Sequence, residues 1–244
     1  MSEQIRFLID QLPNLLWGFP SRRPGGLVMT FILTAVAVGV GFFLAAAVAL
    51  GHHSKFALVR VLSRGYVRVV RGIPLIVLLV LLLQILSTGV LGFSVSVLTS
   101  ALVTLVLYSS AYQADIIHTG IASVPQQLLD DARLHGAGWF QLARTVSLPH
   151  SLRVMRPALA GQLITVFKDT SVVVVIGVAE LTTNARIALG GDVNNAPFWV
   201  ATYLLVGTIY FAFALFLSLL IERRGTRSPR TGARKHTYPS IPNG

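Results

Sequence analysis

The sequence predicts an all-α, polytopic membrane protein with about five transmembrane helices and a helical hairpin on its cytoplasmic side. Of the 244 residues, 54% are hydrophobic and only 12% are charged, and the mean hydropathy is +0.71, far from the values of a soluble domain. The apolar residues gather in runs of about 20, the length needed to cross a hydrocarbon core of about 30 Å. The Lys and Arg residues lie mostly between these runs.

Five apolar runs are long enough to be spans, at residues 26–50, 73–94, 95–114, 157–178 and 198–221. The first contains no charge, and Gln84 is the only strongly polar residue of the second. We expect the first run to be a true span and not a removable signal peptide. It begins 25 residues into the chain, and no small-x-small cleavage site and soluble domain follow it.

Three regions follow from this pattern. Residues 1–25 form an N-terminal segment with leucines at roughly helical spacing, which predicts a helix lying flat on the periplasmic membrane surface; a disordered leader is the alternative. Residues 26–222 form the transmembrane domain. Residues 223–244 are basic, lack periodicity and are rich in Pro, Gly, Ser and Thr, so they predict a disordered cytoplasmic tail.

The distribution of Lys and Arg predicts the orientation. With five spans, the connection 51–72, the polar segment 124–156 and the tail share one side and carry fifteen basic residues. The other side carries four, which are Arg6, Arg22, Arg23 and Arg186. We therefore expect a periplasmic N-terminus and a cytoplasmic C-terminus, although the Arg22–Arg23 pair argues the other way. The net charge of +11 thus reflects topology, and nucleic-acid binding is excluded because no soluble basic surface is predicted.

Arginines recur every four residues in the connection 51–72, at Arg60, Arg64 and Arg68. On a helix they form one basic stripe at the cytoplasmic surface, which favours contact with anionic lipid headgroups. Contact with a protein partner is the alternative.

The segment 124–149 predicts a helical hairpin. Pro125 suits the first turn of a helix, good helix formers continue to residue 135, and Gly136 and Gly138 allow a sharp turn. A second helix over 139–147 is expected to stop at Pro149. Both helices have an apolar side, so the hairpin either docks a partner or lies on the lipid surface.

Charged residues interrupt the centre of the fourth span, at Lys168-Asp169-Thr170-Ser171. A charge there costs about 2.5–3.5 kcal/mol, so it should face protein or water and find a partner. Adjacent helical residues do not face each other, so either a partner lies elsewhere or the helix is unwound at this point. The segment is a candidate part of the substrate pathway, which it would line with Lys168, Asp169, Thr170 and Ser171. The alternative is a buried charged pair that holds helices or protomers together.

The sequence lacks the motifs of several kinds of catalytic and nucleotide-binding sites. It contains no G-x-x-x-x-G-K-[ST] phosphate-binding loop, no H-E-x-x-H and no cysteine, and its histidines are scattered. An enzyme is therefore not expected, and ATP for any ATP-driven process must be bound by another subunit. An ATP-independent channel or secondary transporter for a small polar solute is the alternative function.

The hairpin resembles the "EAA" loop of permeases from binding-protein-dependent ABC importers. Asp130, Asp131 and Ala132 stand at the Glu-Ala-Ala positions, followed by Arg133, by Gly136 at the Gly position and by the closing Leu148-Pro149. Two departures are Asp in place of both the Glu and the first Ala, at Asp130 and Asp131, and His135 where Leu is usual.

Three further motifs, in the same order along the chain, resemble the polar amino acid branch of that family. They are Arg71-Gly72-Ile73-Pro74-Leu75, then Ala111-Tyr112-Gln113-Ala114-Asp115-Ile116 with Gly120-Ile121, and then Lys168-Asp169-Thr170-Ser171 with Ile176-Gly177-Val178-Ala179-Glu180-Leu181.

The resemblance implies the fold of a type I ABC importer permease in a bacterial inner membrane. It implies that an ATP-binding subunit dimer, which carries ATP and Mg²⁺, receives the hairpin through Asp130, Ala132, Arg133, Gly136, Leu148 and Pro149. A second permease, itself or a paralogue, and a periplasmic amino-acid-binding protein are the other expected partners. No cofactor is expected in this chain. The outer loop with Glu180 and Arg186 is a candidate contact for the binding protein, and which amino acid is moved is left open.

Overall fold

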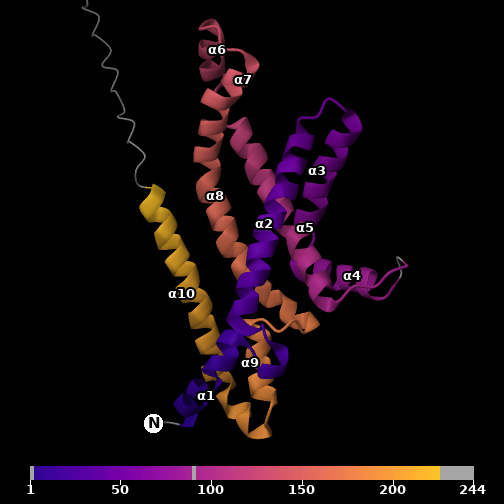
Figure 1. Cartoon of the computed structure of the whole chain (residues 1–244), viewed down its shortest axis with the longest axis vertical. Helices are drawn as coiled ribbons and strands as arrows, with labels where there is room; N and C mark the ends of the chain where they lie inside the picture. Colours follow the sequence, from indigo (N-terminus) through magenta and orange to yellow (C-terminus); the bar gives the residue numbers. More distant parts are fainter. Residues whose placement is uncertain (1–2, 90–91, 226–244) are drawn as a thin grey trace, which may run out of the picture.

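The computed structural model describes residues 3–89 and 92–225, and this part of the chain is helical almost throughout (Figure 1). An isolated β-bridge joins Gly26 and Glu180. The α-helices are α1 Glu3–Trp17, α2 Gly26–His52, α3 Ala57–Gly72, α4 Leu75–Ser87, α5 Val97–Ala122, α6 Gln126–Leu134, α7 Trp139–Leu142, α8 Leu148–Asp169, α9 Leu181–Gly190 and α10 Trp199–Gly225. Short 3-10 turns occupy Pro20–Arg22, Thr170–Ile176 and Val193–Phe198, and a π-helical turn occupies Ala143–Ser147.

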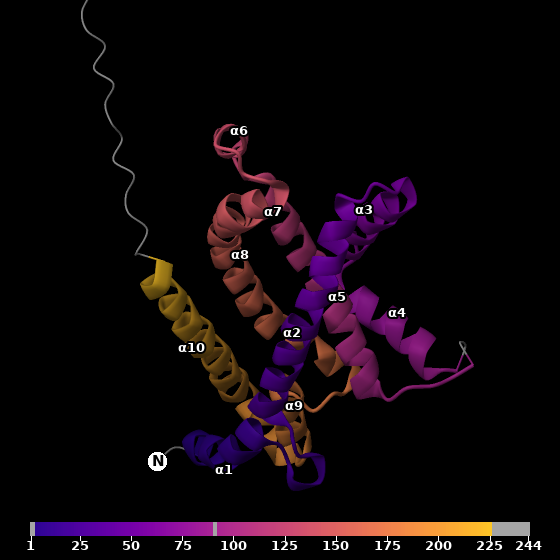
Figure 2. The same cartoon turned by 45° about the horizontal axis from the view of Figure 1, so that its top comes forward.

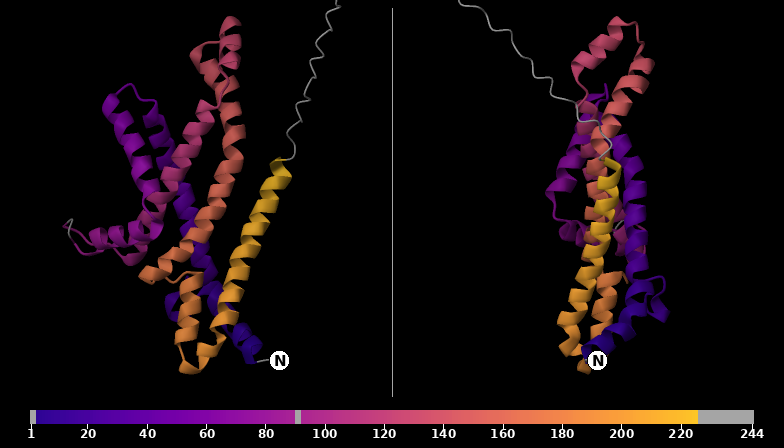
Figure 3. Two further views of the ribbon diagram at one scale, coloured as in Figure 1. Left: turned by 180° about the vertical axis from the view of Figure 1, so that it is seen from behind. Right: turned by 90° about the vertical axis from the view of Figure 1, so that its left-hand side faces the viewer.

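Three long helices, α2, α5 and α8, form the centre of the molecule (Figures 1 and 2). Helices α2 and α5 run in the same direction, toward the end that carries α6 and α7, and α8 returns from it. We call this the hairpin end. Helices α1 and α9 lie at the opposite end, from which α10 runs back along the outside of the bundle (Figure 3).

The contact between α2 and α5 is the most extensive in the molecule. Its α2 side is a stripe of residues four apart, all buried, and every member after the first is small: Leu33, Ala37, Gly41, Ala45 and Ala49. A methyl group on Gly41 would lie 3.3 Å from the Val106 carbonyl oxygen of α5. Small residues therefore let the two backbones approach closely, which is how apolar helices gain packing energy without help from water.

The expected second span, 73–94, is wrong in its extent. Helix α4 has 13 residues, about 20 Å at 1.5 Å per residue, and α3 and α4 meet at an angle of 111°. Pro74 caps α4 and cannot donate a backbone hydrogen bond, so the chain turns at this point. Within residues 3–89 and 92–225, four helical segments are long and apolar enough to cross a membrane, or five if the bent pair counts as one.

The other spans are confirmed, with shifted ends. The third extends through α5 to Ala122, and the fifth corresponds to α10. The fourth begins earlier, because one helical segment runs from Phe140 to Ile176. The basic stripe expected on a helix is present on α3. Of the predicted tail, residues 226–244 lie outside the described part of the chain.

The N-terminal segment is helical, as its leucine spacing predicts. Leu15 is fully buried against Leu181, Ala185 and Val206, so α1 is packed onto α9 and α10. Four of its other apolar side chains, Ile5, Ile9, Leu12 and Trp17, are exposed, and Phe7, Leu8 and Leu16 are half-buried. Its position on the membrane surface stays a prediction.

Glu180, which belongs to the outer loop expected to be a candidate contact for the binding protein, is buried. Its carboxylate caps α9 by accepting hydrogen bonds from the backbone N–H groups of Thr182 and Thr183, both 2.8 Å long. It also accepts from the hydroxyls of Thr183 and Tyr210, each at 3.0 Å. This carboxylate therefore joins α9 to α10 and does not offer a contact to a soluble partner.

Candidate functional site

The hairpin forms where α5 passes into α6 and the chain then turns back into α7 (Figure 1). Helix α6 ends in a Schellman motif, in which the N–H of Gly136 bonds to the Arg133 carbonyl and that of Ala137 to the Ala132 carbonyl. Gly136 has φ +80°, which only glycine adopts without strain. The predicted break at Gly136 is confirmed.

Pro149 does not stop the second helix of the hairpin, contrary to prediction. The chain continues from α7 through the π-helical turn Ala143–Ser147 directly into α8, and Pro149 lies in the first turn of α8. In this turn the Leu148 N–H bonds to the Ala143 carbonyl, five residues back. This wider hydrogen-bonding pattern lets the helix continue past a residue that has no N–H.

Three polar residues of α6 are paired with one another on its surface. Asp130 accepts a hydrogen bond of 2.9 Å from Arg133 and one of 3.2 Å from Gln126. The Asp131 carbonyl and the His135 ring nitrogen lie 2.7 Å apart. The structure thus brings the predicted residues Asp130 and Arg133 together as an ion pair that is half exposed.

Large apolar side chains of the hairpin are uncovered. Leu134 is 85% exposed and Phe140 is 68% exposed, and Leu128 and Leu148 are also exposed. The predicted residue Ala132 is half-buried, and Pro149 is exposed at the start of α8. An exposed apolar surface such as this one, on the hairpin α6–α7, is suited to bind another protein.

The candidate pathway Lys168–Ser171 lies where α8 changes into the 3-10 turn Thr170–Ile176. The Thr170 hydroxyl donates to the Phe167 carbonyl at 2.7 Å, as expected for an interrupted helix. Lys168 is exposed, and neither it nor Asp169 forms an ion pair within residues 3–89 and 92–225. One carboxylate oxygen of Asp169 is buried without a hydrogen-bond partner in the same part of the chain.

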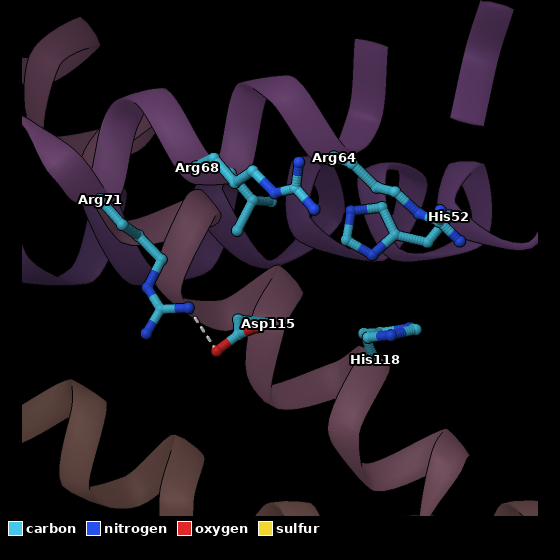
Figure 4. A pocket seen from close by; sticks show the side chains of 7 residues that line it. His52, Arg64, Arg68, Arg71, Asp115 and His118 are labelled. Atoms are coloured by element: carbon cyan, nitrogen blue, oxygen red, sulfur yellow. Dashed lines mark hydrogen bonds and ion pairs between the residues drawn. The ribbon is translucent and has the colours of Figure 1, made fainter. Parts of the chain in front are cut away.

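A basic pocket lies between α3 and the hairpin ends of α2 and α5 (Figure 4). Its volume is about 240 Å³, and it is lined by His52, Arg64, Val67, Arg68, Arg71, Asp115 and His118. Arg71 forms an ion pair of 2.5 Å with Asp115 and lies over the Tyr112 ring, 5.1 Å from its centre. Sequence reasoning missed this pocket, because only the fold brings residues 44 positions apart together.

The fold and these sites can be compared with those of known proteins. A family model described as "Binding-protein-dependent transport system inner membrane component" matches residues 37–224. The chain belongs to this family. It is therefore a multi-pass component of an inner membrane, as its apolar helices also indicate.

Several members of this family are similar to the chain. It is 32% identical over 221 residues to the glutamate/aspartate import permease protein GltK of Escherichia coli O6:H1, an alignment that covers 88% of the chain and 93% of GltK. It is 31% identical over 201 residues, 81% of its length, to the inner membrane amino-acid ABC transporter permease protein YhdY of Escherichia coli K12. The chain spans about half the length of YhdY, 54%, and of BztC from Rhodobacter capsulatus, 52%.

Solved structures agree on the fold class. The crystal structure of an amino acid ABC transporter with histidines matches with a TM-score of 0.80 and 28% identity, over 93% of this chain and all of that one. An inward-facing structure of the MetNI methionine ABC transporter matches with a TM-score of 0.66 and 23% identity, over 93% of this chain and all of that one, which shows the fold alone. The predicted permease fold is confirmed.

Proposed function

We propose that the chain is the permease subunit of an ATP-driven amino acid importer, in which it forms the pathway through the membrane. Family membership and the similarity to GltK and YhdY support this function. The observation that carries it is the hairpin α6–α7, an exposed apolar surface at one end of the central helices. ATP and Mg²⁺ would be held by a dimer of ATP-binding subunits that receives this surface.

In this proposal the hairpin end is cytoplasmic, with the C-terminus on the same side and the N-terminus in the periplasm. The excess of basic residues on this side supports that orientation. A second permease, identical or paralogous, completes the pathway, and a periplasmic amino-acid-binding protein delivers the substrate at the end with α1 and α9.

The hairpin is connected to the membrane pathway through a continuous helix. Helices α7 and α8 are joined by the π-helical turn, so a displacement of the hairpin by the ATPase passes along α8 as a rigid-body movement. The movement reaches Lys168–Ser171, where α8 is interrupted. We propose that Lys168 and Asp169 meet the carboxylate and ammonium groups of a passing amino acid at this point.

The coupling proposal is tested with a pair of glycines in the same turn. Gly136 and Gly138 would each gain a side chain in open space, but only Gly136 has a positive φ. Gly136→Val therefore forces the turn to change, whereas Gly138→Val does not. Each variant is co-purified with its ATP-binding subunit and reconstituted with its binding protein, and ATP hydrolysis and amino acid uptake are measured.

We expect Gly136→Val to lose most of the substrate-stimulated ATP hydrolysis and uptake, and Gly138→Val to keep both. Equal effects of the two variants, at equal yield of membrane-inserted chain, would contradict a coupling role for the turn. Uptake that continues without any ATP-binding subunit would instead support an ATP-independent channel or secondary transporter.

A further inference from the structure

The basic pocket contains more positive charge than its surroundings neutralise. Three arginines line it, and Asp115 is paired with one of them, Arg71. Arg64 and Arg68 form no ion pair or side-chain hydrogen bond within the described residues. Guanidinium groups that line one pocket without a carboxylate partner are suited to bind an oxyanion with several acceptor oxygens.

A second observation points independently to a ligand. His52, the last residue of α2, is only 6% exposed, and it lines the same pocket (Figure 4). Its Nε2 atom is buried and has no hydrogen-bond partner in the described part of the chain. Such a group costs free energy unless something pairs with it.

The position of the arginines on α3 indicates where the ligand comes from. One face of α3 packs on α2 and α5 through Val67 and Val70, and another exposes apolar side chains, including Leu58 and Leu62. At about 100° per residue, the arginine stripe lies along the boundary between these two faces. A molecule that enters the pocket from this side is therefore in contact with an apolar helix surface as well.

The depth of the pocket agrees with a lipid headgroup. Helix α2 has 27 residues, about 40 Å, which exceeds a hydrocarbon core of about 30 Å. His52 ends this helix, and Asp115 and His118 lie in the last two turns of α5. The pocket is thus at the ends of two spanning helices, where headgroups are found.

We propose that this pocket binds the headgroup phosphate of an anionic phospholipid, whose acyl chains lie along the exposed apolar face of α3. Arg64 and Arg68 bind the phosphate oxygens, and His52 donates a hydrogen bond from Nε2. An amino acid is a poorer fit, because the carboxylate that lines the pocket, Asp115, is occupied by Arg71 and does not receive an ammonium group.

The test measures lipid binding to the full chain in its purified complex with the ATP-binding subunit. Native mass spectrometry in detergent follows titration with phosphatidylglycerol, and with phosphatidylcholine of the same acyl chains. We expect at least one tightly held phosphatidylglycerol per chain, bound about tenfold more tightly than phosphatidylcholine. The variant Arg64→Gln/Arg68→Gln should weaken phosphatidylglycerol binding by about tenfold or more for each arginine removed.

A matched control removes two charges outside the pocket. Lys55→Gln/Arg60→Gln alters the turn before α3 and the first turn of α3, and neither residue lines the pocket. This variant should keep the preference for phosphatidylglycerol. Equal weakening by the two double variants would mean that headgroups are attracted by general charge and would overturn the proposal.

His52→Phe is a second, independent variant, which keeps an aromatic ring and removes the unpaired nitrogen. The proposal predicts weaker phosphatidylglycerol binding at an unchanged thermal unfolding temperature in lipid-free detergent, or a higher one. Unchanged lipid binding would overturn it. Displacement of the bound lipid by millimolar L-glutamate, but not by inorganic phosphate, would also overturn it and assign the pocket to the transported substrate.

Discussion

Arg71 and Asp115 join α3 to α5 through an ion pair 2.5 Å long, immediately before the chain turns by 111° into α4. Each residue comes from a different motif of the sequence, and Tyr112 of the second motif lies beneath the guanidinium group. The pair therefore holds the end of α3 against α5, next to the bend at Pro74.

Removing either Arg71 or Asp115 should destabilise the folded chain by a modest amount. Both side chains are 39% exposed, so we expect Arg71→Gln or Asp115→Asn to lower the free energy of unfolding by about 0.5–1 kcal/mol. The double variant should lose less than the sum of the two single losses, because both remove the same interaction. Thermal unfolding of the four proteins in detergent measures this coupling, and additive losses would show that the pair contributes nothing.

The close contact of α2 and α5 makes a second prediction. Gly41→Leu must push α5 away, because even a methyl group meets the Val106 carbonyl, so we expect a loss of about 1–3 kcal/mol. Gly39 lies half a turn away, and a side chain there meets open space. Gly39→Leu is therefore the matched control and should unfold at nearly the temperature of the unaltered chain. Similar unfolding temperatures for both variants would contradict the packing described for this stripe.

Glu180 should make stability depend on pH. Burial raises the pKa of its carboxyl above the ordinary value of 4.5, although hydrogen bonds from Thr182, Thr183 and Tyr210 oppose the shift. The folded chain then binds this proton more tightly than the unfolded chain. Its free energy of unfolding should therefore decrease as pH rises from the ordinary pKa to the folded one, and this contribution should be constant above that range.

The variant Glu180→Gln isolates this contribution, because it cannot titrate. Unfolding temperatures of the two proteins measured across the acidic range should differ in slope, and parallel profiles would contradict the assignment. Glu180→Ala should cost about 1–2 kcal/mol through loss of the cap on α9. Asp192→Ala, which removes one exposed hydrogen bond to the Asn194 N–H, should cost less.

Substitution of Asp169, where α8 is interrupted, should have opposite effects on stability and on transport. Asp169 has a buried carboxylate oxygen without a partner in the described chain, so Asp169→Asn should raise the unfolding temperature. If Lys168 and Asp169 meet the substrate, Asp169→Asn and Lys168→Met should both reduce substrate-stimulated ATP hydrolysis. Normal stimulation with unchanged substrate preference would instead leave these residues a structural role.

The features that could be predicted from the sequence depend on local chemistry. Four of the five apolar runs became helices long enough to cross a membrane, and the φ of Gly136 is one that a glycine between two helix-forming segments is free to adopt. The outcome at Pro149 could not be predicted by the same rule. Proline lacks the N–H donor of one backbone hydrogen bond. Whether a helix ends at the proline or continues through a π-helical turn depends on how the helical segments before and after it are packed.

The basic pocket and the buried Glu180 belong to a second group, which depends on tertiary contacts. Nothing near Glu180 in the sequence indicates that Tyr210, thirty positions later, completes its hydrogen bonds. In the same way, the burial of His52 depends on α3 and α5 lying against α2. Hydropathy patterns locate spans, but they do not show how the ends of those spans meet.

In the π-helical turn Ala143–Ser147 the backbone hydrogen bonds span five residues, whereas those of an α-helix span four. The turn therefore contains one residue more than the same length of regular α-helix. Deletion of one residue within it would turn this stretch into regular α-helix and rotate everything on its far side by about 100° around the axis of α8. Leu134 and Phe140 would then point in a new direction, while Lys168 would stay where it is. One additional residue thus determines the direction in which the exposed hairpin surface faces relative to the part of α8 inside the membrane.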